Sequence, residues 1–262
     1  MSNGNSRLEF LGQLAGGLAH EIKNPLSTIK LTLELLEEDM RKDESPTAMR
    51  ARRKLEVLLR EVQHLDDIVQ EFLAFARGHD MKHTRTDLRA LIVELFEFFG
   101  DEATRRNVRL HFDYDGSLEQ IVLDRTLIRQ ALTNLLRNAF DAVAEKGGGE
   151  VIVRARVKGE LLGLEVIDTG CGIAESNHER MFRPYFTTKK GGTGMGLPMV
   201  RRIVEEHGGQ ITFESELGKG TRFIILLPTN PEKRGSLKSM VAVDPAEVPD
   251  SKATTKDTRE TP

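Results

Sequence analysis

The sequence predicts an α+β protein, in which an N-terminal helical hairpin that forms a dimeric four-helix bundle is followed by an α/β sandwich domain. Three observations lead to this prediction. Residues 1–79 have helical periodicity and almost no strand signal, residues 87–229 alternate between helix and strand patterns, and the polar residues 80–86 connect the two parts. Residues 230–262 combine prolines and charges with little apolar periodicity, which is typical of a disordered tail.

The first part reads as two long helices. One apolar seam runs through Leu11, Leu14, Leu18, Ile22, Leu26, Ile29, Leu33, Leu36 and Met40. The segment KDESPTA ends this helix, and a second seam follows with the spacing of a coiled coil, through Leu55, Leu58, Val62, Leu65, Val69, Phe72 and Ala76. Two helices alone leave half of each seam uncovered, so we expect a homodimer that closes a four-helix bundle.

The second part mixes helices and strands. The predicted helices are 87–103, 124–145 (opened by Asp124) and 197–207, and the predicted strands are 108–114, 150–157, 161–168, 210–215 and 221–228. Strands 150–157 and 161–168 form a hairpin pair. This order predicts a sandwich in which the helices cover one face of a sheet.

Composition limits the possible functions. The 262 residues, 39% of them apolar and 30% charged, leave room for roughly two domains in a globular protein. The formal charge of −3 gives no support to nucleic-acid or membrane-surface binding, and no apolar run approaches the roughly 18 to 20 residues of a membrane span. The single cysteine, Cys171, permits no disulfide within the chain, so a reducing, cytoplasmic setting fits best.

The segment GLAHEIKNPL carries a proline inside the first predicted helix. His20 lies two positions from a seam residue on either side and therefore points roughly 200° away from the seam, at about 100° per residue. Asn24 lies one turn further on the same face, and Glu21 is the immediate neighbour of His20. Pro25 predicts a bend of the helix within one turn of His20.

An exposed imidazole beside a carboxylate is a competent nucleophile, because Glu21 can accept a proton from one ring nitrogen of His20. The Asn24 amide can instead orient a water molecule for the reverse hydrolysis. A solvated surface histidine beside a structural kink is the alternative, and this segment alone does not decide between the two.

Asn134, Asn138 and Asp141 form a polar stripe at i, i+4 and i+7, opposite the apolar face of helix 124–145. Amide and carboxylate oxygens one turn apart suit Mg²⁺, which also keeps waters and phosphate oxygens. The stripe therefore predicts a magnesium and nucleotide site, although a polar solvent face would explain any one of the three residues.

Asp168 ends an apolar row on strand 161–168 and precedes Gly170 and Gly172, which allow a close approach of the backbone to a ligand. Its carboxylate can accept a hydrogen bond from the amino group of a purine. On its own, D-x-G-x-G also fits an ordinary turn.

A glycine-rich loop with Gly192, Gly194 and Gly196 leads directly into helix 197–207. Free N–H groups at such a helix start form an anion site suited to a polyphosphate. The preceding segment FRPYFTTKKGG supplies Thr187, Thr188 and Lys189 on a predicted lid, where Lys189 can neutralise a terminal phosphate.

Five motifs in this order, H-E-x-x-N-P, N-x-x-x-N, D-x-G-x-G, F-x-x-x-F-T-T-K and G-T-G-x-G-L, make residues 8–228 resemble the transmitter core of a two-component sensor histidine kinase of the nitrogen-regulation type. The resemblance implies a dimeric hairpin that bears a phosphoacceptor histidine and a Bergerat-type ATP-binding domain. It also implies a response-regulator receiver domain as partner. Because few residues precede the first predicted helix, we expect the sensory part to be missing or to come from a separate protein.

The resemblance also implies the role of each residue. His20 would be phosphorylated, Glu21 would be its general base, and Asn24 would serve a phosphatase reaction on the partner. Lys189 would act with them, on the terminal phosphate. The implied ligands of ATP are Asn134, Asn138, Asp141, Asp168, Gly170, Gly172, Thr187, Thr188, Gly192, Thr193, Gly194, Gly196 and Leu197, of which Asn134 and Asn138 would also contact Mg²⁺.

Three other classes of protein fit the sequence less well. ATPases resembling gyrase carry a water-activating glutamate four residues before the metal-binding asparagine, where this sequence has Asn134. Serine kinases of the anti-sigma type lack the H-E-x-x-N helix. A non-catalytic scaffold or a pure phosphatase is disfavoured by the intact lid lysine and glycine loop. For His79 and His83, which have the spacing of a metal pair, we expect solvated linker histidines.

Overall fold

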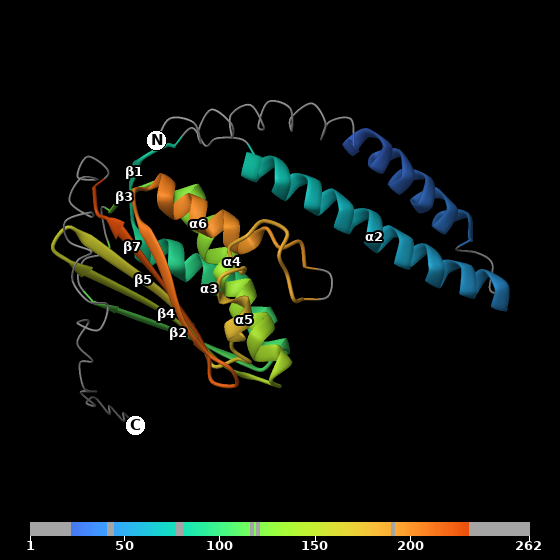
Figure 1. Ribbon diagram of the computed structural model, residues 1–262. Coiled ribbons are helices and arrows are strands. Elements are labelled where there is room, and N and C mark those ends of the chain that lie inside the picture. Colours follow the sequence, from blue (N-terminus) through green and yellow to red (C-terminus); the bar gives the residue numbers. More distant parts are fainter. Residues whose placement is uncertain are drawn as a thin grey trace, which may run out of the picture.

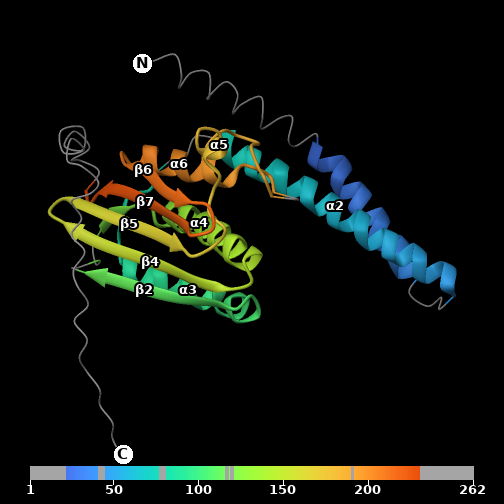
Figure 2. The same ribbon diagram turned by 60° about the horizontal axis from the view of Figure 1, so that its bottom comes forward.

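A computed structural model describes residues 22–40, 45–76, 81–115, 118, 121–189 and 192–230. Two helices form the N-terminal hairpin, the first over residues 22–39 and the second, α2, over Pro46–Ala76. They lie side by side in both views (Figures 1 and 2). Lys30 Nζ donates to Gln63 Oε1 across the hairpin, at 2.9 Å. His20 and Glu21 lie outside the described residues.

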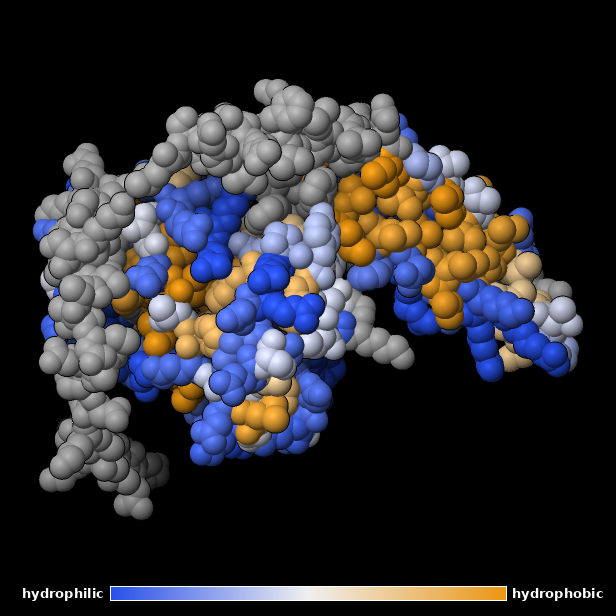
Figure 3. Space-filling model, in the orientation of Figure 1, coloured by the Kyte–Doolittle hydropathy of each residue, from blue (hydrophilic) through white to orange (hydrophobic). Residues whose placement is uncertain are grey.

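Within one chain the predicted seam is only partly covered. Leu26, Leu55 and Val62 are buried, whereas Ile29 and Leu58 are 47% and 49% exposed. Figure 3 shows apolar side chains gathered on one face of the hairpin. The described hairpin therefore carries an apolar face that it does not bury by itself.

The second part contains a five-stranded sheet in the order β2-β4-β5-β7-β6. Its strands are β2 (Val108–Asp115), β4 (Gly149–Lys158), β5 (Leu161–Asp168), β6 (Gln210–Glu216) and β7 (Gly220–Pro228). β2 and β4 are parallel, and the other neighbouring strands are antiparallel. Helices α3 (Leu88–Arg105), α4 (Arg125–Glu145) and α6 (Gly196–Glu206) cover one face of the sheet, as Figure 2 shows, and the short α5 (Glu175–His178) precedes the lid. The predicted α+β fold is thus confirmed.

Local sequence explains why the helices begin where they do. Asp124 has an extended backbone, and its side chain accepts the N–H groups of Thr126 and Leu127, which caps α4. Asp87 caps α3 in the same manner, by accepting the N–H of Ala90. The apolar faces of the three helices and the inner face of the sheet share one core, whose largest fully buried side chains include Phe99 and Phe140.

The sequence did not predict β1 (Thr84–Thr86) and β3 (Ile121–Leu123), which pair as a separate antiparallel ladder. Each has only three residues, and T-R-T lacks the apolar alternation that reveals a strand. The pairing attaches the end of the predicted connector to the residues just before α4. His83, expected to be a solvated linker histidine, is half-buried and meets the ring of His207 edge-on, with the ring centroids 5.9 Å apart.

Candidate active site

The polar stripe on α4 is present as the sequence predicts. Asn134, Asn138 and Asp141 are all half-buried on this helix. Asn134 Nδ2 lies 3.4 Å from the carbonyl oxygen of Gly196, the first residue of α6. This contact joins the stripe to the end of the glycine-rich loop.

The lid lysine reaches the same stripe. Lys189 Nζ donates to Asn138 Oδ1 at 2.9 Å and to Asp141 Oδ2 at 2.8 Å. The second carboxylate oxygen, Asp141 Oδ1, accepts from Arg106 at 2.8 Å. Burial would raise the pKa of Asp141, but hydrogen bonds and charges from Lys189 and Arg106 outweigh it and hold the pKa below its usual value. Asp141 is therefore a carboxylate between two cations.

Asp168 is buried at the end of β5, with 6% of the residue exposed. Its Oδ1 accepts the backbone N–H groups of Gly170 at 2.8 Å and Thr221 at 3.3 Å. Burial raises the pKa of this carboxyl above its usual value, although these two N–H groups act in the opposite direction. Oδ2 accepts no hydrogen bond from the described residues, so one fixed acceptor remains for a ligand.

The loop after Asp168 requires glycine for reasons of space. A Cβ on Gly170 would lie 2.5 Å from the carbonyl carbon of Ala142 on α4. Gly172 has φ +70°, and a Cβ there would collide with the backbone of Glu216. The loop is thus packed directly against α4 and against the end of β6.

The glycine-rich loop opens α6 without a side-chain cap. Met195 occupies the N-cap position and provides no side-chain hydrogen bond, so the first N–H groups of the helix are available to an anion. Gly194 has φ +70°, and Thr193 Oγ1 accepts the N–H of Met195. Leu197 packs against the core and fixes the first turn of the helix.

The lid residues are exposed. Thr187, Thr188 and Lys189 all lie at the surface, and Thr187 Oγ1 accepts the Lys189 N–H at 3.1 Å. Gly192 approaches this turn closely, since a Cβ there would lie 2.7 Å from Thr187 Oγ1. The start of the glycine-rich loop therefore lies against the lid residues.

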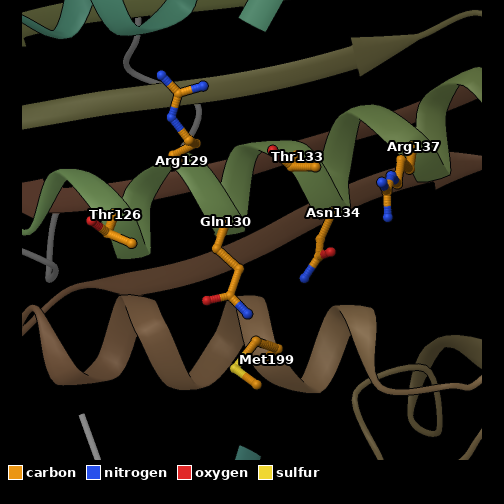
Figure 4. A pocket seen from close by; sticks show the side chains of 7 residues that line it. All are labelled: Thr126, Arg129, Gln130, Thr133, Asn134, Arg137 and Met199. Carbon is orange, nitrogen blue, oxygen red and sulfur yellow. The ribbon is translucent and has the colours of Figure 1, made fainter. Parts of the chain in front are cut away.

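A cavity of about 440 Å³ lies between α4 and α6 (Figure 4). Its lining residues are Thr126, Arg129, Gln130, Thr133, Asn134, Arg137 and Met199. Figure 4 shows Gln130 and Asn134 pointing toward α6, and Arg129 pointing away from it. Sequence reasoning missed Gln130 and Arg137. Gln130 could have been found from its position, because it lies four residues before Asn134 and so on the same stripe of the helix.

Two family profiles match the chain. The His Kinase A (phospho-acceptor) domain matches residues 10–80, and the histidine kinase-, DNA gyrase B- and HSP90-like ATPase matches residues 123–231. The phosphoacceptor match is what separates this chain from the gyrase and chaperone ATPases. The chain belongs to the sensor histidine kinase family.

A named relative carries the same family name. The sensor histidine kinase ZraS of Escherichia coli O157:H7 is 37% identical over 224 residues, which are 86% of this chain and 47% of ZraS. The chain thus spans about half the length of this curated relative.

Solved structures extend the likeness to three dimensions. Histidine kinase ThkA in complex with the response regulator protein TrrA is 29% identical, with a TM-score of 0.63, over 87% of this chain and 65% of that chain. Full-length ShkA in complex with AMPPNP is 25% identical, with a TM-score of 0.70, over 82% of this chain and 45% of that chain.

Part of the predicted phosphoacceptor segment of this kinase is described. Asn24 and Pro25 are exposed, and residues 22–39 are helical through the proline. The carbonyl of Asn24 accepts the hydroxyl of Thr28 at 3.1 Å, one turn further along the helix. The bend beside His20 stays a prediction, since His20 lies outside the described residues. In the described part of the chain, no helix has the length and apolarity needed to cross a membrane.

Proposed function

We propose that this chain transfers the terminal phosphoryl group of ATP to His20 and then passes it to an aspartate of a response-regulator receiver domain. The observation that carries the proposal is the meeting of Lys189 from the lid with Asn138 and Asp141 of α4, close to the uncapped start of α6. A cation and free N–H groups gathered in one place suit a polyphosphate. The bound AMPPNP of ShkA and the bound regulator of ThkA support the two partners.

The nucleotide is expected to lie with its adenine on Asp168 and its phosphates toward α6. Asp168 Oδ2 would accept the adenine amino group, and Gly170 and Gly172 would allow the base to approach the backbone. The polyphosphate would meet Asn134 and the glycine-rich loop, where Gly192, Thr193, Gly194, Gly196 and Leu197 stand, together with Thr187 and Thr188 of the lid.

The residues of α4 fit a magnesium ion. The amide oxygen of Asn138 and the carboxylate of Asp141 already accept one cation, the Lys189 ammonium group, and both are ligand types that Mg²⁺ prefers. Asn138 would hold the ion, with Asn134 beside it. When bound, Mg²⁺ would neutralise charge on the phosphates. The protein contributes positioning and exclusion of water.

Glu21 is proposed as the general base that takes a proton from His20, whose ring nitrogen attacks the terminal phosphorus. The new bond is P–N, the broken bond joins the terminal phosphorus to the bridging oxygen, and ADP leaves. Asn24 is proposed to orient water for the opposite activity, hydrolysis of the phosphorylated regulator. A histidine kinase that also acts as a phosphatase would account for an exposed amide one turn from the acceptor.

The assembly is proposed to be a homodimer through the exposed apolar face of the hairpin, with the described parts in the cytoplasm, where ATP is available. We place the hairpin at residues 1–79, the connector at 80–86, the ATP-binding domain at 87–229 and the tail at 230–262. A sensory part is proposed to act from a separate protein or another segment.

The decisive experiment incubates the purified protein with γ-³²P-ATP and Mg²⁺ and then treats it with acid or alkali. We expect label that is labile to acid and stable to alkali, and that is absent from His20→Ala. His64→Ala, which removes another histidine of the hairpin, is the matched control and should be labelled normally. Label that persists in His20→Ala would place the acceptor elsewhere, and an unlabelled protein that still binds ATP would indicate a phosphatase or scaffold.

A further inference from the structure

A chain of ionic hydrogen bonds runs from the end of α3 to the lid. Arg106 donates to Asp141 Oδ1 at 2.8 Å, and Lys189 donates to Asp141 Oδ2 at 2.8 Å. Arg106 lies 35 positions before Asp141 in the sequence, and Lys189 lies 48 positions after it, so the three residues come from three separate parts of the chain. Asp141 thus connects an arginine at the end of α3 with the lid lysine that is expected on the terminal phosphate.

The guanidinium group of Arg106 is held in place from two sides. The guanidinium group also contacts Glu102 Oε1 at 2.8 Å, one helical turn back. The backbone N–H of Arg106 donates to the carbonyl of the same residue, Glu102. Asn107 follows with φ +55°, and its carbonyl accepts the N–H of Gly149 at the start of β4. The chain reversal after α3 therefore fixes where Arg106 stands, and Arg106 in turn fixes the carboxylate plane of Asp141.

Lys189 has two acceptors with different roles. Asn138 Oδ1 is the proposed metal ligand, and one oxygen cannot hold a metal ion and an ammonium group at hydrogen-bond distance without strong repulsion between the two cations. Asp141 has no such conflict and keeps a full negative charge. When a metal ion binds Asn138 Oδ1, the Lys189 ammonium group would keep only its hydrogen bond to Asp141, beside the nucleotide phosphates.

We propose that Arg106 is a positioning residue for phosphoryl transfer, which orients Asp141 so that Asp141 holds the lid lysine Lys189 next to the terminal phosphate. The proposal rests on the proposed function, because it takes Lys189 as the ligand of that phosphate. Arg106 touches neither nucleotide nor histidine in this scheme and acts only through Asp141.

The contribution of this chain of contacts to folding should be small. The Arg106, Asp141 and Lys189 side chains are 38%, 44% and 41% exposed, and ion pairs at such positions contribute little to stability. Removing Arg106 should therefore leave the melting temperature nearly unchanged. The removal of Arg106 should instead reduce the preference of the protein for nucleotides with a terminal phosphate, which Lys189 is proposed to bind.

The test measures the dissociation constants of Mg²⁺-ADP and of a Mg²⁺-bound, non-hydrolysable ATP analogue by calorimetry. In Arg106→Gln we expect the affinity for the ATP analogue to fall about three- to fivefold with the affinity for ADP unchanged, the size of one weakened charge contact. Arg106→Lys should recover part of the loss. Arg109→Gln is the matched control, since Arg109 also forms an exposed ion pair, with Glu150 at 2.8 Å, and should behave as the wild type.

The same proteins are then assayed for phosphorylation of His20, where Arg106→Gln should raise KM for ATP more than it lowers kcat. The proposal would be overturned if Arg106→Gln kept the wild-type preference for the ATP analogue over ADP. It would also be overturned if Arg109→Gln lost this preference as much as Arg106→Gln does. Lys189→Gln distinguishes the role of Arg106 from the role of Lys189. If Lys189→Gln keeps the wild-type preference for the ATP analogue over ADP, the role of Lys189 in the proposed function is wrong. If Lys189→Gln loses this preference and Arg106→Gln keeps it, only the role of Arg106 is wrong.

Discussion

Tyr185 and Gly194 lie against each other with left-handed backbones, at φ +64° and φ +70°. A Cβ on Gly194 would lie 2.5 Å from the carbonyl carbon of Tyr185. The two residues bracket the predicted lid, so the backbone leaves the domain and returns to it at one point. A tyrosine at positive φ is an uncommon, strained conformation that the surrounding contacts must hold.

Gly194→Ala should weaken nucleotide binding more than folding. The added methyl group meets the backbone of Tyr185, so the base of the lid must widen, and we expect at least a tenfold loss of ATP affinity. Gly159→Ala is the control, because Gly159 has φ +62° in open space and carries only the backbone cost of about 1–2 kcal/mol. Equal nucleotide affinity in the two variants, measured by calorimetry, would contradict the steric argument.

Asp168→Asn should abolish tight binding of both ATP and ADP. An asparagine can keep its oxygen toward Gly170 and Thr221, but it then presents an NH₂ donor where Oδ2 now stands, facing the donor of the adenine amino group. We expect a loss of about 100-fold or more, because a buried polar group would be left without a partner. Asp113→Asn, on the outer face of the sheet, should bind nucleotide normally. An Asp168→Asn protein with wild-type affinity would show that the adenine binds elsewhere.

His207 should make the ATP-binding domain sensitive to acid. Burial lowers the pKa of this imidazole, whose Nε2 accepts the Asp124 N–H at 3.1 Å and whose Nδ1 contacts the Ile203 carbonyl. Because the folded pKa lies below the unfolded value of 6.5, the unfolded state binds more protons, and stability is lost as the pH falls below about 6.5.

The measurement is the free energy of unfolding of wild type and His207→Gln between pH 7.5 and 5.5. The wild type should lose stability more steeply, by up to about 1.4 kcal/mol per pH unit from this one group. The glutamine side chain does not titrate, so other ionisable groups contribute equally to both curves. Parallel curves would contradict the assignment.

Leu58→Ser should dissociate the dimer. Leu58 lies on the exposed apolar face of the hairpin and is 49% exposed in the single chain. Val57→Ser is the control, since Val57 is 55% exposed but lies outside the predicted seam. Sedimentation equilibrium should show a monomer for the first variant and a dimer for the second, and two dimers would place the interface on a different face.

The sequence predicted best those features that depend on neighbouring residues. The start of α4 at its Asp124 cap and the polar stripe of Asn134, Asn138 and Asp141 appear as expected. Features that depend on distant partners were missed. Nothing in T-R-T indicates that Thr84–Thr86 pairs with residues nearly 40 positions later, and no local pattern connects Arg106 with Asp141.

The parallel pairing of β2 with β4 was not predicted, although a helix between two strands, here α4, is the usual crossover between parallel neighbours. The role of Asp141 as a nucleotide ligand stays a prediction. Its two oxygens are taken by Arg106 and Lys189, a pairing that only the fold reveals.

Asp124 joins the connector to α4 and α6, the two helices of the proposed nucleotide site. Its Oδ2 accepts the N–H of Lys82, its Oδ1 caps α4, and its own N–H is bound by His207 at the end of α6. A displacement of the chain at Lys82 would therefore be passed directly to α4 and α6 through the hydrogen bonds of one residue. Asp124 is thus the point at which the position of the connector and the positions of both helices depend on one another.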